Sequence, residues 1–154
     1  MSLQVLYPPM DIFASQAQTL VNAVNCAGVM GKGLALAFKR RFPAMYADYV
    51  ARCKADQVRL GEPYLFRCDT PPWIVNFPTK QHWRSPSSTE DIMAGLLYLQ
   101  RHYREWGITA LAVPALGCGL GGLDWDEMRP IFETHLARLD IAVELYAPVD
   151  SGRS

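Results

Sequence analysis

Residues 21–34 read VNAVNCAGVMGKGL, an apolar run that passes into a glycine loop and then into a segment with helical spacing. Residues 113–123, VPALGCGLGGL, repeat this order near the end of the chain. Glycine lets backbone N–H groups approach an anion closely, and a helix that starts just after the loop adds the positive end of its dipole. Two such loops in one small domain predict two walls around a single diphosphate.

The first loop differs from the Walker A motif of nucleotide triphosphatases. That motif ends in Gly-Lys followed by Ser or Thr, whereas Lys32 is followed here by Gly33, and Cys26 stands at the position of the first glycine. Without the hydroxyl that would bind magnesium, a nucleotide triphosphatase is excluded.

The second loop satisfies the dinucleotide pattern G-x-G-x-x-G through Gly117, Gly119 and Gly122. It comes at the end of the chain, and no second nucleotide-binding half follows it. Either loop alone is explained by a tight strand-to-helix turn. Together, with Asn22 and Asn25 beside the first loop, they favour a ligand site.

The composition is that of a single neutral domain. The chain has 154 residues, half of them hydrophobic, which is enough for one sizeable core. Lys plus Arg and Asp plus Glu both number 15, so the formal net charge is zero. Proteins that bind nucleic acid through bulk electrostatics are usually basic, so any contact with nucleic acid must be local here.

The cysteines and histidines form no metal-binding pattern. No CxxC pair occurs among Cys26, Cys53, Cys68 and Cys118, and the three histidines do not cluster with them. We therefore expect no metal and no cofactor. Free thiols and the lack of a signal peptide predict a cytoplasmic protein. No apolar run is long enough to span a membrane, so no membrane contact is expected.

Strands and helices alternate along the chain, which predicts an α/β fold with a mostly parallel or mixed sheet between two layers of helices. The apolar runs that predict strands are 3–7, 20–24, 64–68, 73–77, 109–114 and 141–146. Helical spacing covers 34–42, 44–54, 88–106 and 125–139. The domain is expected to span residues 1–149, with 150–154 as a flexible tail or linker stub.

Capping residues mark the ends of the last two predicted helices. Ser88 begins the third helix and Gly107 stops it, and Asp124 or Asp126 begins the fourth. Pro130 is expected in the first turns of the fourth helix, where a missing N–H is tolerated.

Four short motifs together resemble the macro domain family: Asp11-Ile12, VNAVN at 21–25, GVMGKGLA at 28–35 and PALGCGLGG at 114–122. The resemblance covers nearly the whole chain. It implies a three-layer α/β/α macro-domain sandwich with a mixed central sheet, and the binding of ADP-ribose. The stretch NFPTKQHWR at 76–84 is similar to the branch of the family that uses a catalytic lysine, and within it to the macro domains of DarG antitoxins.

The resemblance to DarG antitoxins implies an activity and partners. Those macro domains remove ADP-ribose from thymidine in single-stranded DNA, which undoes the action of the toxin DarT, so ADP-ribosylated DNA and a DarT-type toxin are expected partners. Two alternatives share all the binding loops: a non-catalytic ADP-ribose reader, and a hydrolase of protein ADP-ribose esters or of ADP-ribose 1″-phosphate. A dinucleotide oxidoreductase would require a nicotinamide cofactor and hydride transfer.

The same resemblance implies roles at individual positions. Asp11 accepts a hydrogen bond from the adenine amino group, the Ile12 backbone reads the ring, and Tyr146 packs on adenine. Asn22 or Asn25 faces the distal ribose, so both are candidate catalytic residues, although one of them is expected to cap local backbone. Further ADP-ribose contacts are expected from Thr79 and from the loop residues Gly31, Lys32, Gly33, Leu34, Gly117, Cys118, Gly119, Leu120 and Gly121.

Lys80 is the expected catalytic residue. Hydrolysis breaks the bond between the anomeric carbon of the distal ribose and a base nitrogen, and these motifs place no carboxylate pair of the glycosidase type. Lys80 acts either as an ammonium that stabilises the leaving base, or as a free amine that attacks the anomeric carbon, which requires a lowered pKa. A human relative in this branch has an aspartate where this chain has Gly121, and Asp124 is the nearest carboxylate. Since Asp124 is expected to cap a helix, we expect Lys80 to act without an acidic partner.

Trp83 and Arg84 follow Lys80 closely and are candidate DNA contacts. An aromatic ring and a guanidinium beside the site can stack a flanking base and hold a phosphate of single-stranded DNA. The alternative is a core tryptophan next to an exposed arginine. Cys118 lies between two glycines, but no motif places a histidine base beside it, so we expect it to fill a tight loop rather than act as a nucleophile.

Overall fold

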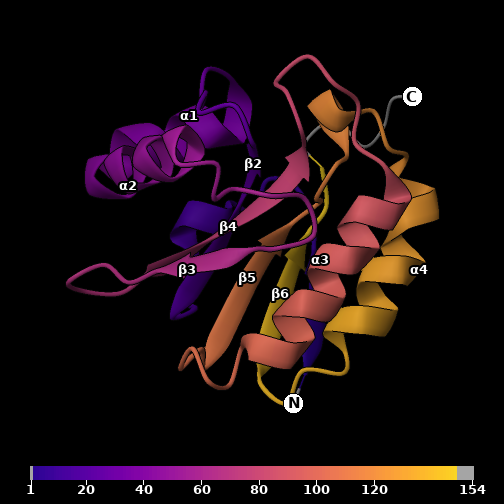
Figure 1. Ribbon diagram of the computed structural model, residues 1–154. Helices are drawn as coiled ribbons and strands as arrows, with labels where there is room; N and C mark the ends of the chain where they lie inside the picture. The colour runs from indigo at the N-terminus through magenta and orange to yellow at the C-terminus, as the bar shows by residue number, and fades with distance from the viewer. Residues whose placement is uncertain (1, 149–154) are drawn as a thin grey trace.

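The computed structural model describes residues 2–148, so residue 149 and the predicted tail at 150–154 lie outside the described residues. The chain forms one sheet with helices on both faces (Figure 1). The strands are β1 (Leu3–Leu6), β2 (Thr19–Asn25), β3 (Tyr64–Phe66), β4 (Trp73–Lys80), β5 (Ala110–Pro114) and β6 (Ala142–Tyr146). The helices are α1 (Gly33–Arg41), α2 (Pro43–Lys54), α3 (Thr89–His102) and α4 (Trp125–Leu136), with short 3-10 turns η1 (Ile12–Ala14) and η2 (Gly119–Gly121).

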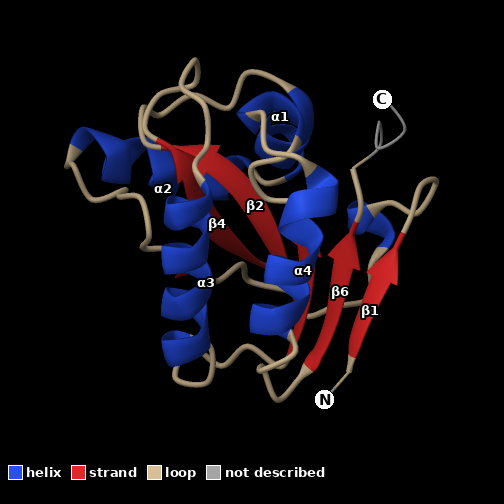
Figure 2. Cartoon of the chain, turned by 90° about the vertical axis from the view of Figure 1, so that its right-hand side faces the viewer, coloured by secondary structure: helices blue, strands red, loops and turns tan. Residues whose placement is uncertain are grey.

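The six strands lie in the order β1-β6-β5-β2-β4-β3. All neighbouring pairs are parallel except β3 and β4, which are antiparallel, so the predicted mixed sheet is confirmed. Helices α1 and α2 cover one face, and α3 and α4 cover the other, as Figures 1 and 2 show. The parallel strands β2, β4, β5 and β6 therefore end at one common edge, where both glycine loops begin.

Each face of the sheet has its own apolar core. Phe77 and Phe132 are fully buried on the α3–α4 face, and Phe38 and Met45 are fully buried on the α1–α2 face. Helix α3 lies close to the sheet because Gly95 has no side chain: a Cβ there would come within 2.3 Å of the Phe77 ring. No helix among the described residues combines the length and apolar character that crossing a membrane requires.

The predicted N-caps of α3 and α4 are found, but the predicted stop of the third helix at Gly107 is wrong, because α3 ends at His102 with Tyr103 as its C-cap. The Ser88 hydroxyl accepts from the Asp91 N–H, and Asp124 accepts from the Glu127 N–H, so both start α3 and α4 as expected. Pro130, however, lies inside α4 rather than in its capping turn. At this depth it removes a backbone N–H that would otherwise bond within the helix.

Strand β4 runs three residues beyond its predicted end at Phe77 and carries the chain to Lys80. Pro78 suggests a strand end. However, the pairing of β3 with β4 stops at Asn76 of β4, so the edge of β4 beyond Asn76 is not paired with β3 and tolerates a proline. The pairing with β2 shifts register near its end: Val24 faces Pro78, but Asn25 faces Lys80. Thr79 is thus the extra residue of a β-bulge directly before the lysine.

Candidate functional site

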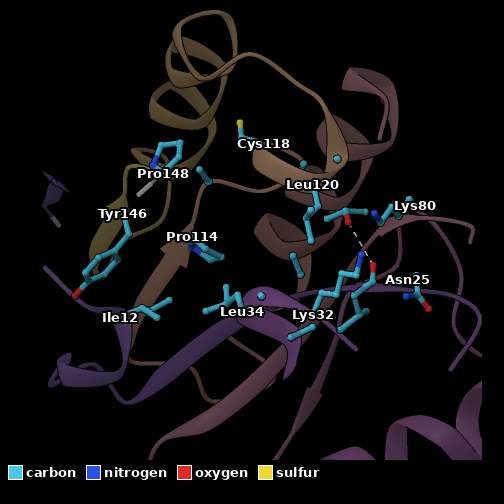
Figure 3. Close-up of a pocket in the computed structure, with 18 of the residues that line it drawn as sticks. Ile12, Asn25, Lys32, Leu34, Lys80, Pro114, Cys118, Leu120, Tyr146 and Pro148 are labelled. Atoms are coloured by element: carbon cyan, nitrogen blue, oxygen red, sulfur yellow. Dashed lines mark hydrogen bonds between the residues drawn. The ribbon is translucent and has the colours of Figure 1, made fainter. Parts of the chain in front are cut away.

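A cavity of about 920 Å³ opens at the carboxyl ends of the parallel strands. Its size is in the range of sites that enclose a whole small ligand. Figure 3 shows Ile12 and Tyr146 at one end and Lys80 at the other. Its walls include most of the predicted site residues: Asp11, Ile12, Asn25, Gly31, Lys32, Gly33, Leu34, Thr79, Lys80, Trp83, Arg84, Gly117, Cys118, Leu120, Gly121 and Tyr146.

The Ile12–Tyr146 end of the cavity is built from η1 and the end of β6, and hydrogen bonds fix its side chains. Asp11 begins η1 by accepting from the Phe13 N–H through Oδ1 at 3.0 Å, which leaves its second oxygen unused by this cap. The Tyr146 hydroxyl donates to Glu144, which also accepts from the Ser15 hydroxyl. Burial is the main cause that raises the pKa of Tyr146 to about 12, so its ring stays neutral at ordinary pH.

The first glycine loop is organised by Asn25. Its amide nitrogen donates to the Val29 carbonyl at 2.8 Å, and its Oδ1 accepts from the Ala27 N–H at 2.9 Å. The buried Tyr49 hydroxyl lies 2.7 Å from the Asn25 carbonyl oxygen and 2.9 Å from Oδ1. Asn25 therefore lines the cavity while its amide is committed to shaping the loop.

The N-terminus of α1 faces this cavity with its first turn uncapped. Residues 31–35 all line the cavity. Lys32 is the N-cap residue and makes no side-chain cap, and the first turn carries no acidic residue, whereas α3 and α4 are both capped by side chains and begin with acidic residues. Backbone N–H groups at such a helix start, together with the helix dipole, are suited to a phosphate group.

The second glycine loop approaches the cavity through positions where no side chain fits. Gly117 has φ +78, and a Cβ there would come within 2.7 Å of Leu123. At Gly121 a Cβ would come within 2.5 Å of the Ser87 hydroxyl. The expected absence of an acidic partner at position 121 thus has a steric cause, and Asp124 is used as the cap of α4.

Lys80 ends β4, the strand next to β2 and the first loop, and is half-buried. The Cys26 N–H lies 3.2 Å from both the Lys80 and the Gln81 carbonyl oxygens, so the first loop holds the backbone at the lysine. The Thr79 hydroxyl donates to the Val24 carbonyl at 3.3 Å, which fixes the bulge. Lys80 is thereby placed at one end of the cavity by backbone contacts on both sides.

The charged side chains around the cavity are mostly positive, although the formal net charge of the chain is zero. Lys32, Lys80 and Arg84 line it, and Asp11 beside Ile12 is its one carboxylate within the part of the chain that the structure describes. Four ion pairs occur among residues 2–148, and none includes these three cations. No group of three or more potential metal ligands is found in the same range. The cavity is therefore suited to an anionic ligand.

Two predicted residues do not line the cavity, which corrects the expected site. Asn22 is fully buried in β2, and its amide nitrogen donates to Asn76 Oδ1 at 3.1 Å, so it does not face a ligand. Gly119 is absent from the cavity wall, although both its neighbours belong to it. The expectation that one of the two asparagines would be engaged with backbone applies to Asn25, which nevertheless reaches the cavity.

Cys118 lines the cavity as a thiol. Burial is the main cause that raises its pKa to about 11, so the group is protonated at neutral pH. The absence of a thiolate supports the expectation that Cys118 fills the loop rather than acting as a nucleophile.

Several cavity residues were missed, some because their sequence carries no functional signal and others because, within the quoted motifs, their apolar side chains predict packing rather than binding. Residues 8–10, Pro-Pro-Met, line the end beside Asp11, and Ala147 and Pro148 continue from Tyr146. Their adjacency to predicted residues is the one sequence clue that could have found them. The remaining missed wall residues are Ala23, Val24, Val29, Ala35, Pro114 and Ala115.

The chain is similar to a known protein family over most of its length. The family model of the Macro domain matches residues 21–132. A protein of Mycobacterium tuberculosis named DNA ADP-ribosyl glycohydrolase is 42% identical over 154 residues, which cover 97% of this chain and 44% of that protein. The chain thus spans less than half of the length of this relative.

Two solved structures are similar along nearly the whole chain. The structure described as Thermosipho africanus DarTG in complex with ADP-ribose matches with a TM-score of 0.91 and 38% identity, over 98% of this chain and 43% of that one. The macrodomain of Mycobacterium tuberculosis DarG matches with a TM-score of 0.88 and 42% identity, over 96% of this chain and 99% of that one.

Proposed function

Because the chain belongs to the macro domain family, we propose that it is a glycohydrolase that removes ADP-ribose from thymidine in single-stranded DNA. The observation that carries this proposal is the cavity itself, which runs from the Ile12–Tyr146 pocket past an uncapped helix start to Lys80. These three parts suit adenine, a diphosphate and a bond to be broken, in that order. Relatives named for this activity, at 42% identity, support the same reading.

Exposed apolar side chains in the cavity wall favour a nucleobase as the acceptor. Val29 and Leu120 line the cavity and are 38% and 69% exposed. Exposed apolar side chains around a site suit a planar, weakly polar leaving group. Figure 3 shows Leu120 on the side of the cavity that holds Lys80.

In the proposed reaction, water adds to the anomeric carbon of the distal ribose as its bond to the base nitrogen breaks, and the base leaves with a proton. The α1 N-terminus and Lys32 hold the diphosphate, which fixes the sugar relative to Lys80. Lys80 acts at the breaking bond in one of two ways: as an ammonium it stabilises the leaving base while water attacks the sugar, or as an amine it displaces the base, which takes up a proton, and water then releases the sugar from Lys80. Mass spectrometry of Lys80 during turnover separates these roles, because only amine attack leaves a sugar adduct on it.

The partners follow from the same proposal. The ADP-ribosylated base is made by a DNA ADP-ribosyl transferase, so we propose a DarT-type toxin as the partner whose product this domain removes; one similar structure is described as DarTG. We place the reaction in the cytoplasm, since all four cysteines are free thiols and a reducing compartment keeps them so.

The test compares acceptors directly. A single-stranded oligonucleotide with one ADP-ribosylated thymidine is incubated beside a protein with an ADP-ribosylated glutamate and beside ADP-ribose 1″-phosphate. The proposal expects release from the oligonucleotide, lost in Lys80→Ala while that variant still binds ADP-ribose by calorimetry. Release from the ester or the phosphate alone would assign the domain to those hydrolases, and binding without any release would make it a reader.

A further inference from the structure

We propose that Trp83 and Arg84 form a second subsite, which binds the nucleotide next to the modified thymidine and makes the enzyme prefer a DNA strand over a free nucleoside. This inference rests on the proposed function, and deepens it by assigning the residues that recognise the strand. It is carried by the segment between Lys80 and α3, residues 81–87, which lies against both glycine loops.

Both ends of this segment are fixed to the loops that shape the cavity. At its start, the Lys80 and Gln81 carbonyls share the Cys26 N–H of the first loop. At its end, the Ser87 N–H donates to the Gly121 carbonyl of the second loop at 2.9 Å. Between them, the Ser85 N–H donates to the His82 carbonyl at 2.9 Å. The middle of the segment is therefore held in place without being buried.

Trp83 stands in this middle part as an exposed ring. It is 41% exposed and belongs to neither apolar core, so the reading as a core tryptophan is wrong. The His82 ring lies 5.0 Å from it, and the Arg84 guanidinium lies 4.3 Å from the ring centroid. The Arg84 N–H also donates to His82 Nδ1 at 3.2 Å. Short local contacts thus hold the ring at the cavity mouth, where it also lines the cavity.

The chemistry of the pair fits one nucleotide of a single strand. Exposed aromatic rings stack nucleobases in single-stranded nucleic acid, and a guanidinium binds a phosphate. Arg84 has no acidic partner among the ion pairs of residues 2–148, so its charge is available. Since Lys80 and Trp83 line the same cavity and Trp83 is exposed, a strand whose modified base lies at Lys80 can place its neighbouring nucleotide on this ring.

The test uses two substrates that differ only beyond the modified nucleoside: ADP-ribosyl-thymidine alone, and the same thymidine inside a short single-stranded oligonucleotide. We expect the wild-type protein to have a higher kcat/KM on the oligonucleotide. In Trp83→Ala this preference should fall by about tenfold, the order of one base–aromatic stack, because kcat/KM falls more on the oligonucleotide than on the free nucleoside. Trp83→Phe should keep most of the preference, and Arg84→Gln should reduce the salt dependence of oligonucleotide binding by about one phosphate contact.

Tyr7→Ala provides a matched control, because Tyr7 is a second exposed aromatic ring with an arginine, Arg129, over it, but does not line the cavity. It should leave the preference intact. Binding of both substrates is also measured in the Lys80→Ala background, so that the inference is tested even without turnover. Equal loss on both substrates, or no loss on either, would overturn the Trp83 subsite. Lys80-dependent turnover of the free nucleoside reports separately on the proposed function.

Discussion

The backbone N–H of Ser87 donates to the carbonyl oxygen of Gly121 at 2.9 Å, and the Ser87 side chain fills the space that any side chain at position 121 would need. These contacts join the segment after Lys80 to the second glycine loop. The Ser87 hydroxyl is buried and has no hydrogen-bond partner within the described residues, so its main contribution is its volume.

Gly121→Ala should weaken ADP-ribose binding by pushing the second loop away from Ser87. The new Cβ would lie 2.5 Å from the Ser87 hydroxyl and 3.1 Å from its Cβ, and overpacking of this kind typically destabilises by about 1–3 kcal/mol. The measurement is calorimetric titration with ADP-ribose together with thermal unfolding.

Adding Ser87→Gly to Gly121→Ala tests whether the clash with Ser87 causes the loss of binding. It removes the Ser87 Cβ and hydroxyl, so the double variant should recover much of the affinity that Gly121→Ala loses. Ser87→Gly alone shows the effect of the added backbone freedom. If Gly121→Ala binds like the wild type, or if the double variant is no better than the single one, steric exclusion by Ser87 is not the reason for the glycine.

Tyr49→Phe should destabilise the first glycine loop. The Tyr49 hydroxyl is fully buried and lies within hydrogen-bond distance of two Asn25 oxygens, so its loss leaves the buried Asn25 carbonyl without this donor. We expect the free energy of unfolding to fall by about 1–3 kcal/mol and ADP-ribose affinity to fall with it. Urea unfolding and calorimetry measure the two effects.

Tyr46→Phe is the matched control on the same helix. Its hydroxyl is 3.5 Å from the Gly28 carbonyl, too long for a strong hydrogen bond, so the change should stay within about 0.5 kcal/mol. Equal effects of the two variants would show that Asn25 does not depend on Tyr49.

Stability should fall above about pH 9 through two partly buried thiols. Burial is the main cause that raises the pKa of Cys26 and of Cys118 from 9.0 to about 11. Between these values the unfolded chain loses the thiol protons and the folded chain keeps them, so rising pH favours unfolding, and the stabilisation is fully present only below pH 9.

Denaturant unfolding from pH 8 to pH 11 with reductant present measures this loss. The double variant Cys26→Ala, Cys118→Ala should have a flatter profile between pH 9 and pH 10; since the tyrosines and the other two thiols titrate in both proteins, the difference between the two profiles reports on Cys26 and Cys118. A wild-type profile as flat as that of the double variant would contradict the assignment to these thiols.

The sequence was sufficient to predict every strand and helix, because apolar runs alternate with segments of helical spacing and polar caps mark the starts of α3 and α4. It misplaced the end of β4, since Pro78 reads as a strand end unless the shortness of β3 is known. Most cavity residues were also predicted, because they lie in or beside short sequence motifs that can be recognised without knowing the fold. Tyr49 and Ser87, which hold the two glycine loops in place, were not predicted, because their contacts depend on how segments far apart in the sequence pack.

The bulge at Thr79 makes the site depend on the number of residues in β4. Side chains alternate between the faces of a strand, so one extra residue reverses the face to which the following side chain points, relative to regular pairing. Deleting Thr79 would keep Lys80, both loops and every other wall residue, yet would turn the lysine toward the opposite layer of helices. Relatives of this chain that retain the lysine but differ by one residue in this strand would therefore lack the reaction, a loss that no substitution scan would detect.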